Sequence, residues 1–315
     1  MKPLIFGLTL AIGLFTSGIF FTISHAFAQQ INCDPSYPEV CIPPYPPDLN
    51  CGDISDRRFA VLPPDPHGFD WNNDGIGCEI GGGQSGGLPV QETAQGTVQC
   101  GQIVQGIVTL TANLTCSEDG LIVGSDGTTI NLNGFGIYGP GADSDKIGIG
   151  VSENNIIING PGNISGFQAG ILATNSRGLS INSAILQGNQ IGVFLTGSSI
   201  TSIKENTIKN NNIAVASHSA TRINAEDNSM VGNALAGVTL VNTIDSTFRN
   251  NSIQGSQNGI FLDAQSTGNT VQLNNARGNV VDLNNANGLG LTVNQNTFSD
   301  NNCQVSNPSG LCFGR

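Results

Sequence analysis

A short motif recurs about every 22 residues from Gly148 almost to the C-terminus of this chain. Each copy opens on a small residue that is followed by alternating apolar positions. The copies begin at Gly170, Gly192, Ala214, Gly237, Gly259 and Val280, in steps of 22, 22, 23, 22 and 21 residues. A fixed period this short indicates stacked supersecondary units, so the repeated region forms one continuous object.

A second motif, an asparagine before a short apolar stretch, keeps the same period. It occurs at Asn206, Asn228 and Asn251, and again at Asn296 after two further repeats. Stacking would place Asn206, Asn228 and Asn251 in one column, where each amide donates to one neighbour and accepts from the other. A continuous ladder removes the cost of burying an amide, so we expect these asparagines to be interior.

The repeat unit has the alternation of β-strands. Ile191, Val193 and Leu195 alternate with Gly192, Phe194 and Thr196, and no stretch has the 3.6-residue period of a helix. The pattern predicts a coil of two or three strands per turn, each pairing with its equivalent one turn later at about 4.8 Å. Equivalent residues should then share interior rows, with Val193, Val215, Val238 and Ile260 in one of them.

On these repeats, residues 100–313 resemble the right-handed parallel β-helices of the pectin-lyase-like superfamily. The segment 120–134 is similar to the first turns of such proteins. The resemblance implies an all-β, right-handed parallel β-helix. Members of this superfamily include lyases, hydrolases, epimerases, adhesins and binding proteins, so the resemblance says little about activity.

The N-terminus has the features of a secretory leader. A lysine at position 2 precedes a mostly apolar run over 4–23, and Ala26-Phe27-Ala28 forms an Ala-x-Ala cleavage site. We therefore expect residues 1–28 to be a signal peptide, and the protein to be secreted, extracellular or displayed on the cell surface. The apolar run is also long enough to be kept as an N-terminal anchor, and the sequence predicts no other membrane contact.

Cysteine usage agrees with export, because all eight cysteines follow the leader. Spacing favours a disulfide between Cys100 and Cys116 at one end of the solenoid and another between Cys303 and Cys312 at the other end, where open edges need capping. Zinc is a poor alternative, because the chain has no Cys-x-x-Cys and no nearby pair of histidines. The remaining cysteines are Cys33, Cys41, Cys51 and Cys78.

Composition divides the chain beyond the leader into three parts. Residues 31–79 are rich in clustered prolines and have nine acids against two bases, whereas 81–87 are almost all glycine. We expect a small module over 29–80, a Gly-rich linker over 81–98 and the β-helix over 99–315.

The small module contains a calcium-loop pattern. Residues 70–75 read Asp-Trp-Asn-Asn-Asp-Gly, in which oxygens at alternate positions can converge on a hard cation and Gly75 permits the sharp turn. An EF-hand would continue to a bidentate Glu at its twelfth position, but Gly81 stands there. The expected metal ligands are Asp70, Asn72, Asp74, Ile76 and Glu79.

This variant resembles the excalibur module, an extracellular calcium-binding region with the signature Asp-x-Asp-x-Asp-Gly-x-x-Cys-Glu. The resemblance implies that Cys51 pairs with Cys78, which leaves Cys33 to pair with Cys41. Asn72 stands where the family usually has Asp, so we expect weak Ca²⁺ binding, at about 10⁻⁴ to 10⁻³ M. An Asx-rich turn without an ion is the alternative interpretation.

The net negative charge of the chain limits the classes of ligand that it can bind. Without the leader the chain has 10 bases and 23 acids, a net charge of −13. No basic patch exists to neutralise phosphates, so nucleic acid and anionic lipid are unfavourable partners. Acidic polysaccharide could still be approached through bridging calcium. Lys204, Glu226 and Arg249 should stack with alternating sign, which helps to fix register.

The sequence offers no convincing catalytic group or organic cofactor site. Lyases of this fold need calcium-binding carboxylates and a base, and hydrolases need two or three clustered acids. Glu205 and Asp227 should lie one turn apart, but solvated side chains are the favoured interpretation. His218 should lie two turns from Asp263, about 10 Å away, too far for direct pairing.

An outward column offers the best hint of a binding surface: Leu172, Phe194, Ala216, Thr239 and Phe261. Exposed rings could stack on sugars, although a covering loop is the alternative. The favoured function is a non-catalytic, exported, calcium-binding surface or matrix protein that binds polysaccharide or cell-surface components. The alternative is a carbohydrate-active enzyme, either a polysaccharide lyase or a glycoside hydrolase. The sequence sets no oligomeric state.

Overall fold

The computed structural model describes residues 33–46, 49, 53–54, 56, 59–70, 75–78 and 98–313. The chain divides into two compact units, residues 1–90 and 91–315. The predicted leader over 1–28 lies outside the described residues.

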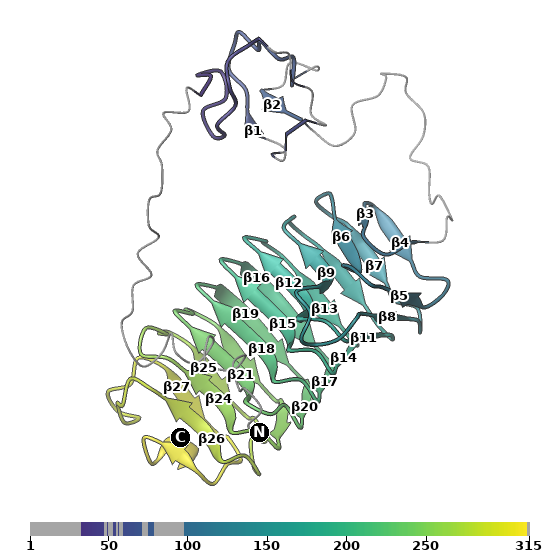
Figure 1. The fold of residues 1–315 in the computed structure, drawn as a ribbon. Helices are drawn as coiled ribbons and strands as arrows, with labels where there is room; N and C mark the ends of the chain where they lie inside the picture. Colours follow the sequence, from purple (N-terminus) through teal and green to yellow (C-terminus); the bar gives the residue numbers. More distant parts are fainter. Residues whose placement is uncertain are drawn as a thin grey trace, which may run out of the picture. The chain divides into compact units, whose positions relative to one another are not determined.

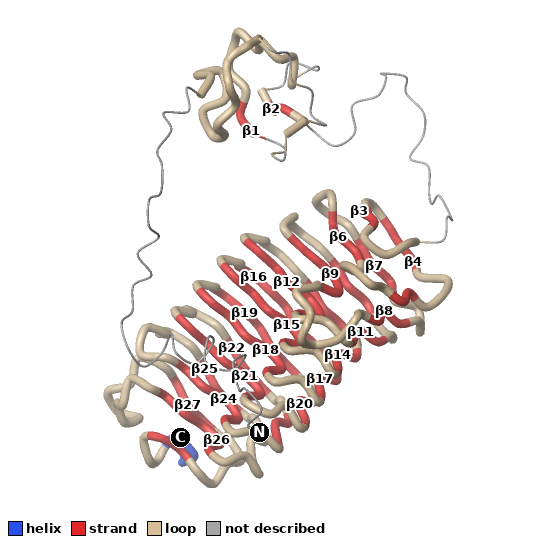
Figure 2. Tube along the Cα trace, in the orientation of Figure 1, coloured by secondary structure: helices blue, strands red, loops and turns tan. Residues whose placement is uncertain are grey.

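The second unit is a parallel β-solenoid with three strands in each full turn (Figure 1). Its three sheets run along the coil and contain ten, nine and seven strands, joined by short loops (Figure 2). The ten-stranded sheet consists of β3 (Gln102–Val104), β6 (Leu121–Val123), β9 (Ile147–Val151), β12 (Ala169–Thr174), β15 (Ile191–Thr196), β18 (Ile213–His218), β21 (Ala236–Val241), β24 (Asn258–Leu262), β26 (Val281–Asn285) and β28 (Ser306–Asn307).

The other two sheets complete each turn. The nine-stranded sheet consists of β4 (Ile107–Thr109), β7 (Thr129–Asn131), β10 (Ile157–Asn159), β13 (Ser180–Asn182), β16 (Ser199–Lys204), β19 (Thr221–Glu226), β22 (Thr247–Arg249), β25 (Thr270–Gln272) and β27 (Thr297–Ser299). The seven-stranded sheet consists of β5 (Leu114–Thr115), β8 (Gly136–Tyr138), β11 (Asn163–Ser165), β14 (Ile185–Gln187), β17 (Thr207–Lys209), β20 (Ser229–Val231) and β23 (Ser252–Gln254). A short 3₁₀ helix, η1 (Leu311–Phe313), lies at the C-terminal end.

The predicted interior row is confirmed. Val193 pairs with Val215, Val215 with Val238 and Val238 with Ile260, and all four side chains are fully buried. Because each strand pairs with its equivalent one turn later, apolar residues at one repeat position form a continuous stack through the core. This packing explains why the alternation of apolar residues was a reliable guide to the fold.

The corners between the nine- and seven-stranded sheets combine a left-handed residue with a buried asparagine. Glu205 and Asp227 have φ of 57° and 59°, and the residue after each is a ladder asparagine. The amide of Asn206 donates to Asn228 Oδ1 at 3.0 Å, and that of Asn228 donates to Asn251 Oδ1 at 2.9 Å. The expected ladder is therefore confirmed for these three residues.

The ladder continues beyond Asn251 to the last turn. Asn251 donates to Asn274 at 3.0 Å and Asn274 to Asn301 at 3.0 Å, so Asn296 is not a member. Asn296 instead accepts from Asn269 at 3.0 Å, at a corner before the nine-stranded sheet. Asn296 has the motif but lies outside this column, because an asparagine before a short apolar stretch occurs at more than one corner of the last turns.

The last copy of the apolar motif is also displaced from its expected place. Asn258 pairs with Val281 and Ile260 with Leu283, so Asp282, and not Val280, follows Gly259 in register. Val280 is 71% exposed, whereas Leu283 is fully buried. The interior row beneath Ile260 needs a buried apolar side chain, and Leu283 supplies it.

Both ends of the solenoid are closed by disulfides. Cys100 bonds to Cys116 at the first turn, and Cys303 bonds to Cys312 at the last. Near the C-terminal end, the carboxylate of Asp282 is 1% exposed. Its Oδ2 accepts hydrogen bonds from the backbone N–H groups of residues 304 and 305, at 2.8 and 3.0 Å. These two hydrogen bonds hold the final segment against the coil.

The first unit has a small core of its own. Its described residues include the antiparallel pair β1 (Phe59–Ala60) and β2 (Ile76–Gly77) and the disulfide Cys33–Cys41. Tyr37 packs against Phe59 and Phe69, with ring centroids 5.8 and 5.2 Å away. Edge and tilted ring contacts of this kind supply apolar burial in a module too small for a large core.

Replacing a buried ladder amide should destabilise the solenoid more than replacing a partly exposed one. We expect Asn228→Ala to lower the free energy of unfolding by about 3 kcal/mol, because it removes the acceptor for both the N–H and the amide of Asn206. Urea unfolding of purified protein measures the difference. Asn182→Ala is the control, since the Asn182 amide belongs to an outer ladder reached by water. Equal losses in the two variants would contradict the interior ladder as a main source of stability.

Candidate functional site

The described part of the predicted calcium loop is its first residue and its turn. The side-chain Oδ2 of Asp70 accepts from the Gly75 N–H at 2.8 Å, which joins the first and sixth loop positions. Gly75 has φ of 88°, a conformation that a side chain at that position would strain. Asn72, Asp74 and Glu79 lie outside the described residues, as does the side chain of Ile76.

A chain of hydrogen bonds fixes the start of this loop. The N–H of Asp70 donates to Asp65 Oδ2 at 2.8 Å, and the Tyr37 hydroxyl donates to Asp65 Oδ1 at 2.7 Å. Burial, together with this bond, raises the pKa of the Tyr37 hydroxyl, so it remains a donor at neutral pH. Cys78 is disulfide-bonded, and Cys51, its partner by resemblance, lies outside the described residues.

The outer face of the ten-stranded sheet contains two columns without any ionisable side chain. One column contains the predicted outward residues, with Leu172 paired to Phe194 and Thr239 paired to Phe261. The two rings are half-buried. The neighbouring column consists of Ile147, Ala169, Ile191, Ile213, Ala236, Asn258 and Val281. In a chain of net charge −12, this face is suited to apolar and hydrogen-bonding contacts.

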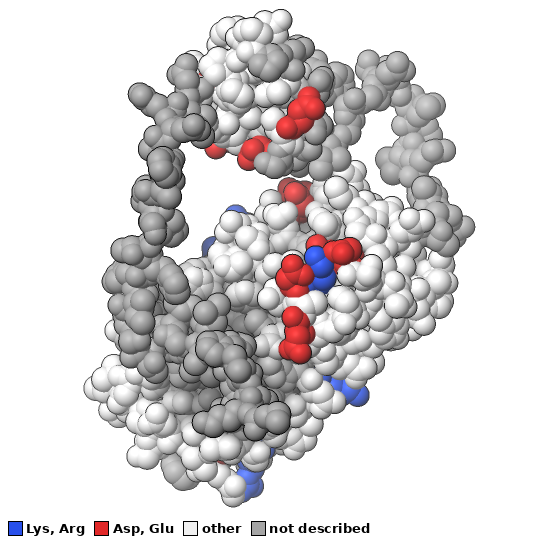
Figure 3. All heavy atoms as spheres, viewed as in Figure 1, with Lys and Arg blue, Asp and Glu red and all other residues white. Residues whose placement is uncertain are grey.

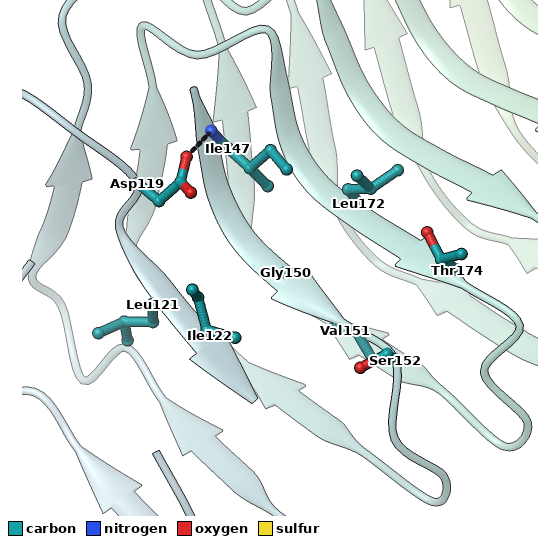
Figure 4. Close-up of a pocket in the computed structure, with 9 residues that line it drawn as sticks. All are labelled: Asp119, Leu121, Ile122, Ile147, Gly150, Val151, Ser152, Leu172 and Thr174. Carbon is teal, nitrogen blue, oxygen red and sulfur yellow. Dashed lines mark hydrogen bonds between the residues drawn. The ribbon is translucent and has the colours of Figure 1, made fainter. Parts of the chain in front are cut away.

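A pocket of about 210 Å³ opens at the N-terminal end of this face (Figure 4). It lies where Gly150 interrupts the outward column between Ile122 and Leu172, and a Cβ on Gly150 would meet nothing within 4 Å. Asp119 lines one end and Thr174 another part of the wall. Sequence reasoning missed this pocket. The sequence feature that could have predicted it is Gly150, because Leu172 and Phe194 occupy the equivalent positions in the next two turns.

The charged column on the nine-stranded sheet is confirmed as a stack of alternating sign. Glu226 accepts from Lys204 at 2.9 Å and lies 3.4 Å from Arg249. The hydrogen bond from Lys204, helped by the charges of both bases, lowers the pKa of Glu226. A general acid needs the opposite shift, so this carboxylate has the properties of a structural ion pair. Much of the visible solenoid surface is uncharged (Figure 3).

The other candidate catalytic residues do not form an acid–base pair. Glu205 and Asp227 are exposed at adjacent corners, and the Asp227 carboxylate accepts from the Asn250 amide. His218 is exposed, whereas Asp263 is 6% exposed and its Oδ1 accepts from the hydroxyl and the N–H of the same serine, at 2.7 and 2.8 Å. Asp263 therefore has a local structural role.

Fold and surface together define this protein as a parallel β-solenoid whose largest sheet has two columns without ionisable side chains on its outer face. Residues 113–311 match the NosD family, described as a periplasmic copper-binding protein. The match extends over more than half of the sequence, and the chain belongs to the NosD family. No helix among the described residues is long and apolar enough to cross a membrane.

No curated protein matches the chain. Among solved structures, the enzymatically active domain of tailspike protein 2 from bacteriophage CBA120 is similar, with 14% identity and a TM-score of 0.43. The similarity covers 64% of this chain and 34% of that one, so the chain spans about a third of the tailspike domain.

The donors in the family-matched region do not fit a copper site. Copper sites in proteins use cysteine, methionine and histidine ligands. Between residues 113 and 311, Cys116 and Cys303 are held in disulfides, and Met230 is fully buried in the core. His218 is the one histidine of that region, and it pairs in register with Thr196 and Val241. The copper named in the family description therefore has no donor set in this part of the chain.

Removing the charge of Glu226 should have an effect that depends on pH. Because the folded-state pKa of Glu226 is lowered, its stabilising contribution is present above the unfolded pKa of about 4.3 and is lost as the pH falls through the folded value. We expect Glu226→Gln to lower Tm at pH 7, with a difference that shrinks below about pH 4. Thermal unfolding across pH measures this. Glu205→Gln, on the exposed neighbour, should show little change, and a pH-independent loss for Glu226→Gln would contradict the ion-pair interpretation.

Proposed function

We propose that this protein is an exported, non-catalytic carbohydrate-binding solenoid with a calcium-binding N-terminal module. The observation that carries the proposal is the outer face of the ten-stranded sheet, where two adjacent columns contain rings, aliphatic side chains, hydroxyls and amides and no charge. Sugars present both apolar C–H faces and hydroxyl groups, so a surface of this mixed composition complements them.

The arrangement along the coil suits an extended ligand. Phe194 and Phe261 belong to the same outward column, three strands apart, which corresponds to about 14 Å. Between them lie Ala216 and Thr239, whose side chains are small. At the C-terminal end the column becomes polar, where Asn307 donates to Asn284 at 3.0 Å. Such a row can contact several units of a polysaccharide.

The cellular location of the proposal is supported by two independent features. The NosD family is described as periplasmic. The chain also contains disulfides at both ends of the solenoid and in the first unit, and such bonds persist in oxidising compartments. We propose that residues 1–28 direct export, and that the mature protein acts in the envelope or outside the cell.

Calcium binding is proposed for the loop that begins at Asp70. The hydrogen bond from the Gly75 N–H to Asp70 Oδ2 supports it, because it brings the first and sixth loop positions together, as a calcium loop requires. The proposed ligand set is Asp70, Asn72, Asp74, Ile76 and Glu79, and Cys51 is the proposed disulfide partner of Cys78. We propose that calcium stabilises the module and is not a catalytic cofactor.

Carbohydrate binding should depend on the two rings. In affinity electrophoresis of the full chain against neutral, acidic and amino polysaccharides, we expect at least one neutral or amino polysaccharide to retard the protein. Phe194→Ala and Phe261→Ala should each weaken binding by about 10-fold, because each removes a stacking platform. The matched control is Tyr138→Ala, which removes a ring from the outer face of the seven-stranded sheet.

Two results would contradict the carbohydrate-binding proposal. One is retardation that is equal in the wild type and in both phenylalanine variants. The other is steady release of unsaturated or reducing ends from polyuronates with calcium, which would favour the alternative of a polysaccharide lyase or glycoside hydrolase.

Calcium binding can be measured through Trp71, which lies inside the loop and is the chain's sole tryptophan. We expect a saturable change in tryptophan fluorescence with a Kd of about 10⁻⁴ to 10⁻³ M. Asp70→Asn and Asp74→Asn should each weaken it by removing a ligand charge. Asp300→Asn, an exposed acid of the solenoid, is the control. A fluorescence signal that does not respond to calcium at about 10 mM would rule out the site.

A further inference from the structure

The pocket at Gly150 has apolar walls with polar groups toward the ends of its strands. Ile122 and Leu172 are its outward neighbours in the column, and Ile147 comes from the adjacent column (Figure 4). Asp119 lies just before β6, whereas Thr174 is the last residue of β12. Its volume of about 210 Å³ is below the range of about 300 to 1,000 Å³ usual for drug-sized ligands. A pocket of this size accommodates one small ring.

Asp119 is held in place with part of its carboxylate unused. Its Oδ1 accepts from the N–H of Ile147 at 2.8 Å, so the side chain is fixed against the start of β9. Its Oδ2 has no hydrogen-bond partner among the described residues, and the residue is half-buried. A fixed carboxylate with a spare oxygen can accept a charge-assisted hydrogen bond from a ligand.

The charges around Asp119 favour a cationic group. Its neighbour Glu118 is paired with Lys146 at 2.7 Å, and the same lysine lies 3.2 Å from Asp145. Lys146 is therefore paired with two acids, and Asp119 is a third acidic residue nearby. A uronate carboxylate would be repelled at this end of the pocket, whereas an ammonium group would be attracted.

We propose that this pocket binds a single pyranose ring that carries a free amino group, namely a de-N-acetylated hexosamine unit of a polysaccharide. Ile122, Ile147 and Leu172 contact the C–H face of the ring, and Asp119 accepts from the ammonium. Thr174, at the far end of β12, contacts a hydroxyl of the neighbouring unit. An N-acetylated unit lacks the charge and adds an acyl group. This inference rests on the proposed carbohydrate-binding function and names the unit that the face selects.

Isothermal titration of the full-length chain with a glucosamine tetramer at about pH 6, where the amines are protonated, tests the proposal. We expect binding at least about 10-fold tighter than for the N-acetylglucosamine tetramer. Asp119→Asn keeps the acceptor for Ile147 and removes the charge, and it should abolish this preference. Gly150→Leu fills the pocket and should reduce affinity for the glucosamine tetramer by at least about 10-fold.

Matched controls separate these effects from misfolding. Gly290 also has open space at its Cβ position, so Gly290→Leu is the control for the added side chain. Asp300→Asn is the control for charge removal, and both controls should bind within about 2-fold of the wild type. Thermal unfolding of each variant confirms that the solenoid is intact before affinities are compared.

The outcomes also separate this inference from the proposed function. If the tetramer binds Gly150→Leu as tightly as wild type, or the two tetramers bind equally, the pocket proposal is overturned. The carbohydrate proposal then stands as long as the phenylalanine variants weaken binding. Competition by spermidine at equal concentration would show a site for amines without sugar recognition. Failure of every oligosaccharide and polysaccharide to bind would overturn both proposals.

Discussion

The ladder of buried asparagine amides at the corners is the interaction on which the rest of this solenoid depends. Asn228 illustrates the constraint, because its Oδ1 accepts from both the N–H and the amide of Asn206 while its own amide donates to Asn251. A shift of one residue in any turn would leave such groups buried without partners. The register is therefore fixed at the corners, and the columns on the sheet faces follow from it.

Because the register is fixed, residues of one type stack along a sheet, and the sheets differ in the charge of their outer faces. The nine-stranded sheet carries the stack of Lys204, Glu226 and Arg249, in which neighbouring charges neutralise each other. Two columns of the ten-stranded sheet carry no charge at all. A rigid, uncharged face with rings and hydroxyls can select ligands by shape and stacking, while the acidic surroundings disfavour polyanions. Within residues 113–311, the cysteines are held in disulfides and Met230 is buried, so the copper of the family description has no donor set there.

Periodicity predicted most of the fold because apolar residues such as Val193 and Val215 repeat at a constant spacing in the middle turns. It was a poorer guide in the last turns. Leu283 follows Ile260 by 23 residues, although the motif was expected to begin at Val280. A longer connection separates Asn301 from Asn274 by 27 residues, so Asn301, and not Asn296, continues the corner ladder. The pocket could not be predicted from periodicity. It exists because Gly150 has no side chain between Ile122 and Leu172, and this gap depends on how the neighbouring side chains pack. The calcium loop remains a prediction from residues 70–79.

Connections of different length are tolerated between the ten-stranded and the nine-stranded sheets. Between β26 and β27 the chain uses residues 286–296, whereas β18 and β19 are joined by two residues, yet β27 still pairs in register with β25. The rim between the two largest sheets thus absorbs inserted segments without disturbing the stacking beneath it. Related chains can exchange rim loops and so acquire different ligand preferences on an unchanged scaffold.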